Sequence, residues 1–221
     1  MVSIASAVIA LDYAAVAVFG ATGALAAARR KHDIITFAFF SAVTGVGGGT
    51  LRDLLLGAPV FWVQRPTYLV VCGLAALAVW LIGPGQGRLR VLLWIDALGL
   101  GAYAVIGAAK AGALGAPPVS SMVMGVLTAC FGGVIRDVLA HEPSVLLRRE
   151  IYVTCAGLGA TSFVALQWAG FPGWAAGAAG FLVGFGARAG GILWDWSLPA
   201  YPGRGEIAAD QEATAKARDP E

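Results

Sequence analysis

The sequence has few charged residues: Asp, Glu, Lys and Arg make up 13% of its 221 residues, against roughly 25% in a soluble domain. The net charge of +2 is too small to indicate a nucleic-acid partner. Hydrophobic residues reach 58% and gather in long apolar runs. Helices that are apolar on every face belong in a membrane or a large buried core. The scarcity of charge and the number of such runs exclude an ordinary soluble domain.

Groups that could support catalysis or bind a metal are also scarce. The two histidines, His32 and His141, lie between apolar runs and lack metal-ligand spacing. The three cysteines lie inside apolar runs without a CxxC pair, and their odd number argues against a disulfide framework. No Ser or Thr has His and Asp partners suited to a triad. The sequence therefore predicts no enzyme, no metal site and no cofactor.

Seven stretches are long and apolar enough to cross a bilayer as helices, which takes about 20 residues each. The sequence predicts an all-α integral membrane protein with a transmembrane domain over residues 1–195. A polar tail over 196–221 is predicted to be disordered and cytoplasmic. The predicted helices cover residues 4–28, 34–57, 67–83, 91–112, 119–140, 151–170 and 173–194.

The positions of Lys and Arg predict the orientation, because cytoplasmic loops carry an excess of both. With the N-terminus outside, the outer loops hold only Arg65 and Lys110. We therefore expect the N-terminus outside and the C-terminus in the cytoplasm. The inner loops then hold Arg29, Arg30, Lys31, Arg88, Arg90, Arg148 and Arg149.

An internal repeat without gaps is the most informative feature. The pair Arg52-Asp53 returns 84 residues later as Arg136-Asp137. Because each copy holds three helices, the second copy enters the membrane from the opposite side. The sequence thus predicts two inverted repeats, about 4–83 and 88–167, with a seventh helix at 173–194 outside them. The same offset relates Asp12 to Asp96, Gly23 to Gly107, Thr44 to Thr128, Gly48-Gly49 to Gly132-Gly133, Pro59 to Pro143, Arg65 to Arg149, Tyr68 to Tyr152 and Gly73 to Gly157.

The second helix of each repeat carries a glycine cluster just before its Arg-Asp pair. Glycine weakens a helix, so we expect the second and fifth helices to be broken there. An unwound turn at membrane depth is tolerated only against protein or a water-filled cavity. The alternative is close helix packing, since Gly45 and Gly49 form a GxxxG pair. The predicted breaks fall at Gly47, Gly48, Gly49, Gly132 and Gly133.

Charged side chains within the apolar runs are the candidate functional residues. Charges at membrane depth usually face an interior cavity and pair with one another. Asp12 and Asp96 lie inside the first helix of each repeat and need a basic partner or a proton. The alternatives are arginines that merely anchor helix ends at the interface, or a purely structural buried network. The candidate pore and gating residues are Arg52, Arg136, Asp53, Asp137, Asp12, Asp96, Thr44 and Thr128.

Two copies of a Gly-Gly-x-x-Arg-Asp helix in a 3+3+1 arrangement resemble the prokaryotic trimeric intracellular cation (TRIC) channels, a group also labelled as predicted glycine transporters. The resemblance covers about residues 4–195. It implies a homotrimer in a bacterial inner membrane, with one pore per protomer that conducts monovalent cations, above all potassium. By motif match it places the helix kinks at the glycine clusters and the basic pore residues at Arg52 and Arg136.

The resemblance has one departure: animal members carry Lys-Glu-Val where this chain has Gly-Gly-Gly, so their phosphoinositide binding is not carried over. The leading expectation is a potassium-permeable cation channel. Its partners are permeant potassium or sodium, membrane lipid and two further copies of the chain. The alternatives are a secondary transporter for a small solute such as glycine, which inverted repeats also suit, and a membrane scaffold without transport.

Overall fold

The computed structural model describes residues 4–83, 86–142, 144 and 151–199. Of the tail predicted to be disordered, 196–221, the residues from 200 onward lie outside the described residues, and so does the Arg148-Arg149 loop. The helices are α1 (Ile4–Arg29), α2 (Ile34–Leu55), α3 (Phe61–Gln64), α4 (Thr67–Ile82), α5 (Gln86–Ala113), α6 (Pro118–Leu139), α7 (Tyr152–Trp168) and α8 (Gly173–Trp194).

A helix lies at each of the seven predicted stretches, and a one-turn helix, α3, joins α2 to α4. Within the described residues, five helices are long and apolar enough to cross a membrane: α1, α2, α5, α6 and α8. The other two, α4 and α7, have 16 and 17 residues. A helix rises about 1.5 Å per residue, so these two fall short of a bilayer core about 30 Å thick.

Local sequence signals set where α2 begins and where α2 and α6 end. Asp33 caps α2 by accepting a 2.8 Å hydrogen bond from the Thr36 backbone N–H. That bond lowers the pKa of the exposed Asp33 carboxyl, because it favours the charged form. Past the C-terminal caps, Gly57 and His141 both adopt a left-handed backbone, at φ 63° and 50°. These two positions are 84 residues apart, so both second helices of the repeats end in the same way.

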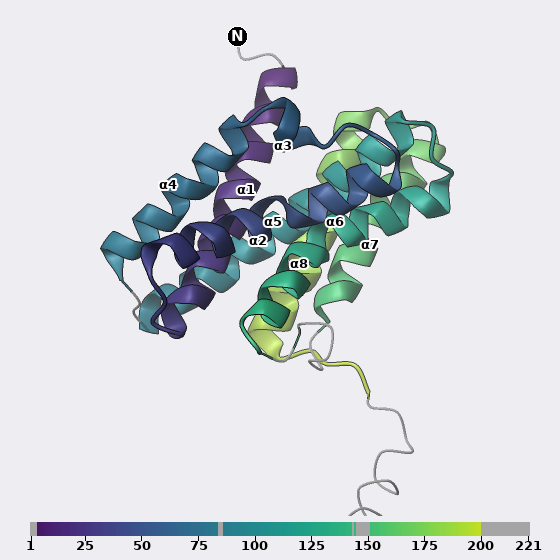
Figure 1. Cartoon of the computed structure of the whole chain (residues 1–221). Coiled ribbons are helices and arrows are strands. Elements are labelled where there is room, and N and C mark those ends of the chain that lie inside the picture. The colour runs from purple at the N-terminus through teal and green to yellow at the C-terminus, as the bar shows by residue number, and fades with distance from the viewer. Residues whose placement is uncertain (1–3, 84–85, 143, 145–150, 200–221) are drawn as a thin grey trace, which may run out of the picture.

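Equivalent helices pack in equivalent pairs in the two repeats. The α1–α2, α1–α4 and α2–α4 contacts of the first repeat correspond to α5–α6, α5–α7 and α6–α7 in the second. Helices α2 and α6 pack on each other between the two halves, and α8 covers α5 and α7. Figure 1 shows α1 and α4, in purple and blue, on one side and α7 and α8, in green and yellow, on the other.

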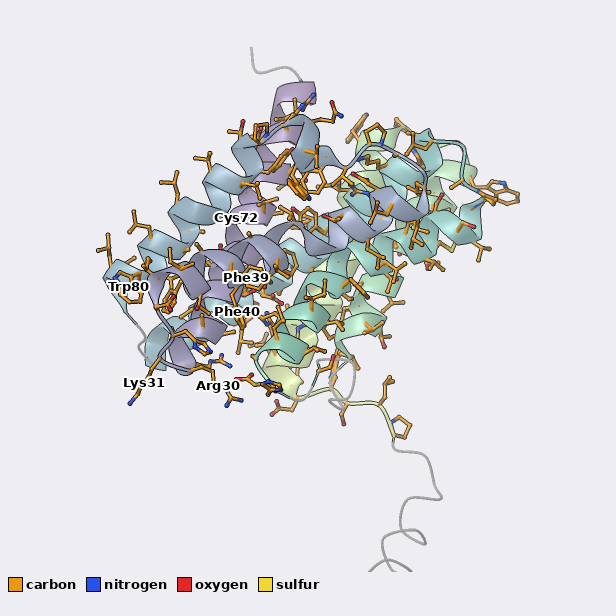
Figure 2. All side chains as sticks on the ribbon, in the orientation of Figure 1. Arg30, Lys31, Phe39, Phe40, Cys72 and Trp80 are labelled. Atoms are coloured by element: carbon orange, nitrogen blue, oxygen red, sulfur yellow. The ribbon has the colours of Figure 1, made fainter. Side chains whose placement is uncertain are left out.

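The two copies run in opposite directions. Arg29, at the end of α1, lies 3.5 Å from Glu142, just beyond the end of α6. The neighbouring Arg30 donates to the His141 carbonyl. Figure 2 shows Arg30 and Lys31 at the lower end of the helix bundle. Helix α2 therefore begins at the end of the bundle where α6 finishes. Lys110, in the last turn of α5, contacts Asp53 near the end of α2, so α6 begins where α2 finishes.

The predicted breaks in α2 and α6 are not confirmed: both helices run uninterrupted through their glycines. The glycines serve close packing instead. A Cβ added to Gly48 would overlap the Thr128 carbonyl oxygen, and one added to Gly132 would overlap the Thr44 carbonyl oxygen. Only residues without a side chain let these two backbones approach so closely. The glycines thus allow the crossing of α2 and α6, which joins the two repeats.

Candidate functional site

The first of two buried ionic clusters is centred on Asp53, whose side chain has no exposed surface. Its Oδ1 lies 2.8 Å from both Arg52 Nη2 and Lys110 Nζ. Its Oδ2 accepts hydrogen bonds from Lys110 Nζ at 2.9 Å and from the Phe61 backbone N–H at 3.0 Å. A carboxylate that loses all contact with water needs such a set of donors to remain charged. Asp53 thereby joins α2 to α5 of the other repeat.

The one-turn helix α3 covers this cluster. The Phe61 ring centroid lies 5.9 Å from both the Arg52 guanidinium and the Lys110 ammonium, within range of a cation–π contact. The neighbouring Trp62 donates from its indole N–H to Thr50 Oγ1 at 2.8 Å. Helix α3 was not predicted from the sequence, although the adjacent aromatic residues between two predicted helices indicate a packed segment.

Asp12 extends the cluster toward α1 and α4. The Tyr68 hydroxyl donates to Asp12 Oδ2 at 2.5 Å, and the Tyr68 ring stacks on Tyr13 with centroids 4.3 Å apart. Arg52 and Lys110 are the positive charges that act on the Asp12 carboxylate. The first repeat therefore gathers the predicted residues Asp12, Arg52 and Asp53 into one network, together with the basic partner Lys110.

The second cluster is built from the matching residues of the other repeat. Arg136 forms hydrogen bonds from Nε at 2.9 Å and Nη2 at 2.8 Å to Asp137 Oδ1. Its Nη1 donates to Thr22 Oγ1 on α1 at 3.0 Å. Asp96 is hydrogen-bonded to Tyr152, as Asp12 is to Tyr68, and it experiences the positive charges of Arg136 and Arg188.

The two clusters lie at different depths and are completed by different residues. Asp12 and Thr22 mark the two clusters on α1, and ten helical residues separate them by about 15 Å. Lys110 completes the first cluster. In the second, Arg188 of α8 lies over the Tyr152 ring at 5.0 Å. The candidate charged residues therefore form two separate networks.

Between the clusters, α1, α2, α5 and α6 meet around Thr44 and Thr128, which are 2% and 4% exposed. Thr128 Oγ1 donates to the Met124 carbonyl at 2.6 Å, a local bond one turn back on its own helix. Glycines of the first helix of each repeat face these hydroxyls: a Cβ on Gly23 or Gly107 would crowd Thr44 Oγ1 or Thr128 Oγ1. Within the described residues there is no group of acidic, His and Cys side chains suited to a metal.

Comparison with known proteins shows which family this chain is similar to. A family model described as "Glycine transporter" matches residues 9–84 and again 93–168, so its two matches begin 84 residues apart, at the offset of the internal repeat. A crystal structure of the TRIC trimeric intracellular cation channel orthologue from Rhodobacter sphaeroides superposes with a TM-score of 0.82 at 49% identity. It covers 86% of this chain and 100% of that one. The chain belongs to the TRIC family.

Other relatives have a similar fold or are inner-membrane proteins. A structure solved to explain conductance through TRIC cation channels has a TM-score of 0.78 at 30% identity, covering 86% of this chain and 95% of that one. The inner membrane protein YadS of Escherichia coli is 37% identical over 198 residues, which are 86% of this chain and 94% of YadS. The chain is therefore a multi-pass membrane protein with bacterial inner-membrane homologues, and its solved relatives are channels, not enzymes.

Proposed function

We propose that this protein is a channel for monovalent cations, permeable to potassium, with one pore through each protomer. The observation that carries the proposal is the pair of buried Arg-Asp clusters centred on Asp53 and Asp137, set between helices of the two repeats. Buried charges within a membrane-spanning bundle usually mark an ion pathway. The solved TRIC cation channels supply the same fold.

Fixed arginines beside a cation pathway are compatible with conduction because each is neutralised in place. Two unit charges 4 Å apart interact with about 1 kcal/mol in bulk-like water and several-fold more in a drier cavity. Asp53 offsets Arg52, and Asp137 offsets Arg136, each at 2.8 Å. The pathway is shut where Gly48 and Gly132 contact the opposite helix. Conduction thus requires α2 and α6 to move apart at this crossing.

The proposal includes the assembly and orientation. We infer a homotrimer with seven membrane spans, in which α4 and α7 also cross because the bilayer thins slightly around short helices. The N-terminus lies outside and the C-terminus inside, as the distribution of Lys and Arg predicts. Cross-linking in detergent is expected to stop at trimers; a ladder that ends at dimers would contradict the assembly.

A planar bilayer with purified protein under a potassium gradient tests the function. We expect discrete unitary currents that reverse near the potassium equilibrium potential. The glycine-transporter description of the matching family model makes coupled uptake the outcome to exclude. Saturable uptake of glycine with fixed coupling and no unitary current would overturn the channel proposal.

Replacing Arg136 with Ala tests whether the second cluster lies on the pathway. The change removes the guanidinium that bonds Asp137 and Thr22 and leaves Asp137 without that counter-charge. We expect a conductance or open probability that differs several-fold from wild type at equal trimer yield. Arg136→Lys, which keeps the charge, is the matched control. A well-folded Arg136→Ala channel with unchanged currents would make Arg136 an anchor at the helix end.

A further inference from the structure

The two repeat-related threonines at the helix crossing differ in how their hydroxyls are bonded. Thr128 Oγ1 is committed to the Met124 carbonyl. Thr44 Oγ1 is buried and has no hydrogen-bond partner within the described residues. The local bond used by Thr128 would correspond to one from Thr44 to the Phe40 carbonyl, and no such bond forms. A buried hydroxyl without a partner is destabilising and uncommon, and such exceptions often have a functional role.

The surroundings of Thr44 place this hydroxyl at the junction of three helices. Its carbonyl oxygen rests on Gly132 of α6, and its hydroxyl faces Gly23 of α1. Both contacts exist only because each glycine lacks a Cβ. One residue before Gly23, Thr22 accepts the Arg136 Nη1 hydrogen bond. Thr44 therefore lies on the α2–α6 crossing that shuts the proposed pathway, and the glycine that its hydroxyl faces is next in the chain to a residue of the second ionic cluster.

The oxygen of a threonine hydroxyl is a suitable ligand for a monovalent cation, because protein oxygens replace the water that an ion sheds in a narrow passage. The Arg136 guanidinium nearby is already neutralised by Asp137 at 2.8 Å, so it does not oppose an ion at this point with an unpaired charge. The uncommitted oxygen can turn toward an ion without breaking an internal hydrogen bond. Thr128 would first have to release the Met124 carbonyl.

We propose that the Thr44 hydroxyl binds a partly dehydrated monovalent cation at the α1–α2–α6 junction, whereas the Thr128 hydroxyl serves its own helix and binds none. The inference rests on the proposed channel function and refines it. The symmetric repeat thereby contains a one-sided ion site, and Thr44 determines how easily an ion passes the crossing.

Three variants measured in planar bilayers with potassium as the permeant ion test this site. Thr44→Val removes the hydroxyl and keeps the shape of the side chain, Thr44→Ser keeps the hydroxyl, and Thr128→Val is the repeat-matched control. Because one hydrogen-bond-sized contact changes an equilibrium by about two- to tenfold, we expect Thr44→Val to alter unitary potassium conductance by that factor. Thr44→Ser should remain near wild type, and Thr128→Val should change the conductance less than Thr44→Val does.

Thermal unfolding and gel filtration of the same preparations show that the variants fold, and Thr44→Val loses no internal hydrogen bond that could destabilise it. Normal wild-type currents with an unchanged Thr44→Val conductance would overturn the site while leaving the channel intact. Equal effects of Thr44→Val and Thr128→Val would overturn its one-sidedness. Absence of unitary currents in the wild-type protein would contradict the channel proposal, and this inference with it.

Discussion

Replacing Asp53 with Asn is expected to lower the free energy of unfolding by about 3–5 kcal/mol, the usual cost of removing one partner from a buried ion pair. Asn keeps an oxygen that can accept the Phe61 N–H bond but carries no charge. Arg52, whose side chain is 5% exposed, then loses its ion-pair partner, and Lys110 loses both of its contacts to Asp53. The midpoint of thermal unfolding in detergent measures the change.

Two further variants test whether the lost stability comes from the buried charges rather than from the Asp-to-Asn change itself. Asp53→Asn combined with Lys110→Gln should recover part of the lost stability, because one of the two positive charges that Asp53 balanced is gone. Asp33→Asn makes the same chemical change at an exposed helix cap, where Asn caps as well as Asp, and should leave the midpoint unchanged. A wild-type midpoint for Asp53→Asn would mean that the cluster contributes nothing to stability.

The sequence predicted the position of every long helix because their apolar runs are separated by short breaker segments. For example, α2 was expected over 34–57 and spans Ile34–Leu55. The repeat was recognisable because identical residues recur at a constant spacing, and the family model matches both copies. The four-residue helix α3 was missed because its stability comes from Phe61 and Trp62 packing on distant residues rather than from any local period.

The glycine clusters show why the local sequence alone could not predict the structure of the site. A glycine can break a helix or admit a neighbour, and only the atoms beside it decide which. The partner of Asp53 on α5, Lys110, is 57 residues away in the other repeat and has no counterpart at the equivalent position of the first copy, Ala26. Thr44 and Thr128 begin the same motif, and the sequence does not show that only one hydroxyl is bonded.

Gly48→Ala should destabilise the protein by about 1–3 kcal/mol, the usual cost of forcing an extra methyl group into a packed interior. The added Cβ would overlap the Thr128 carbonyl oxygen, and this oxygen belongs to the backbone of α6, so no side chain can turn aside. The two helices must separate, or one must shift along the other. Gly132→Ala should have a similar effect, because its Cβ would meet the Thr44 carbonyl oxygen in the same way.

Gly73→Ala is the matched control: the same substitution in a helix is expected to stabilise the protein instead of destabilising it. Gly73 lies within α4, and a Cβ there would meet no atom within 4 Å. Alanine favours a helix over glycine by about 0.5–1 kcal/mol, so this variant should raise the unfolding midpoint in detergent while Gly48→Ala lowers it. Opposite signs would show that the glycines at the crossing are kept for backbone contact between the repeats. Shifts in the same direction would contradict the close approach of α2 and α6, and with it the shut crossing on which the gating proposal depends.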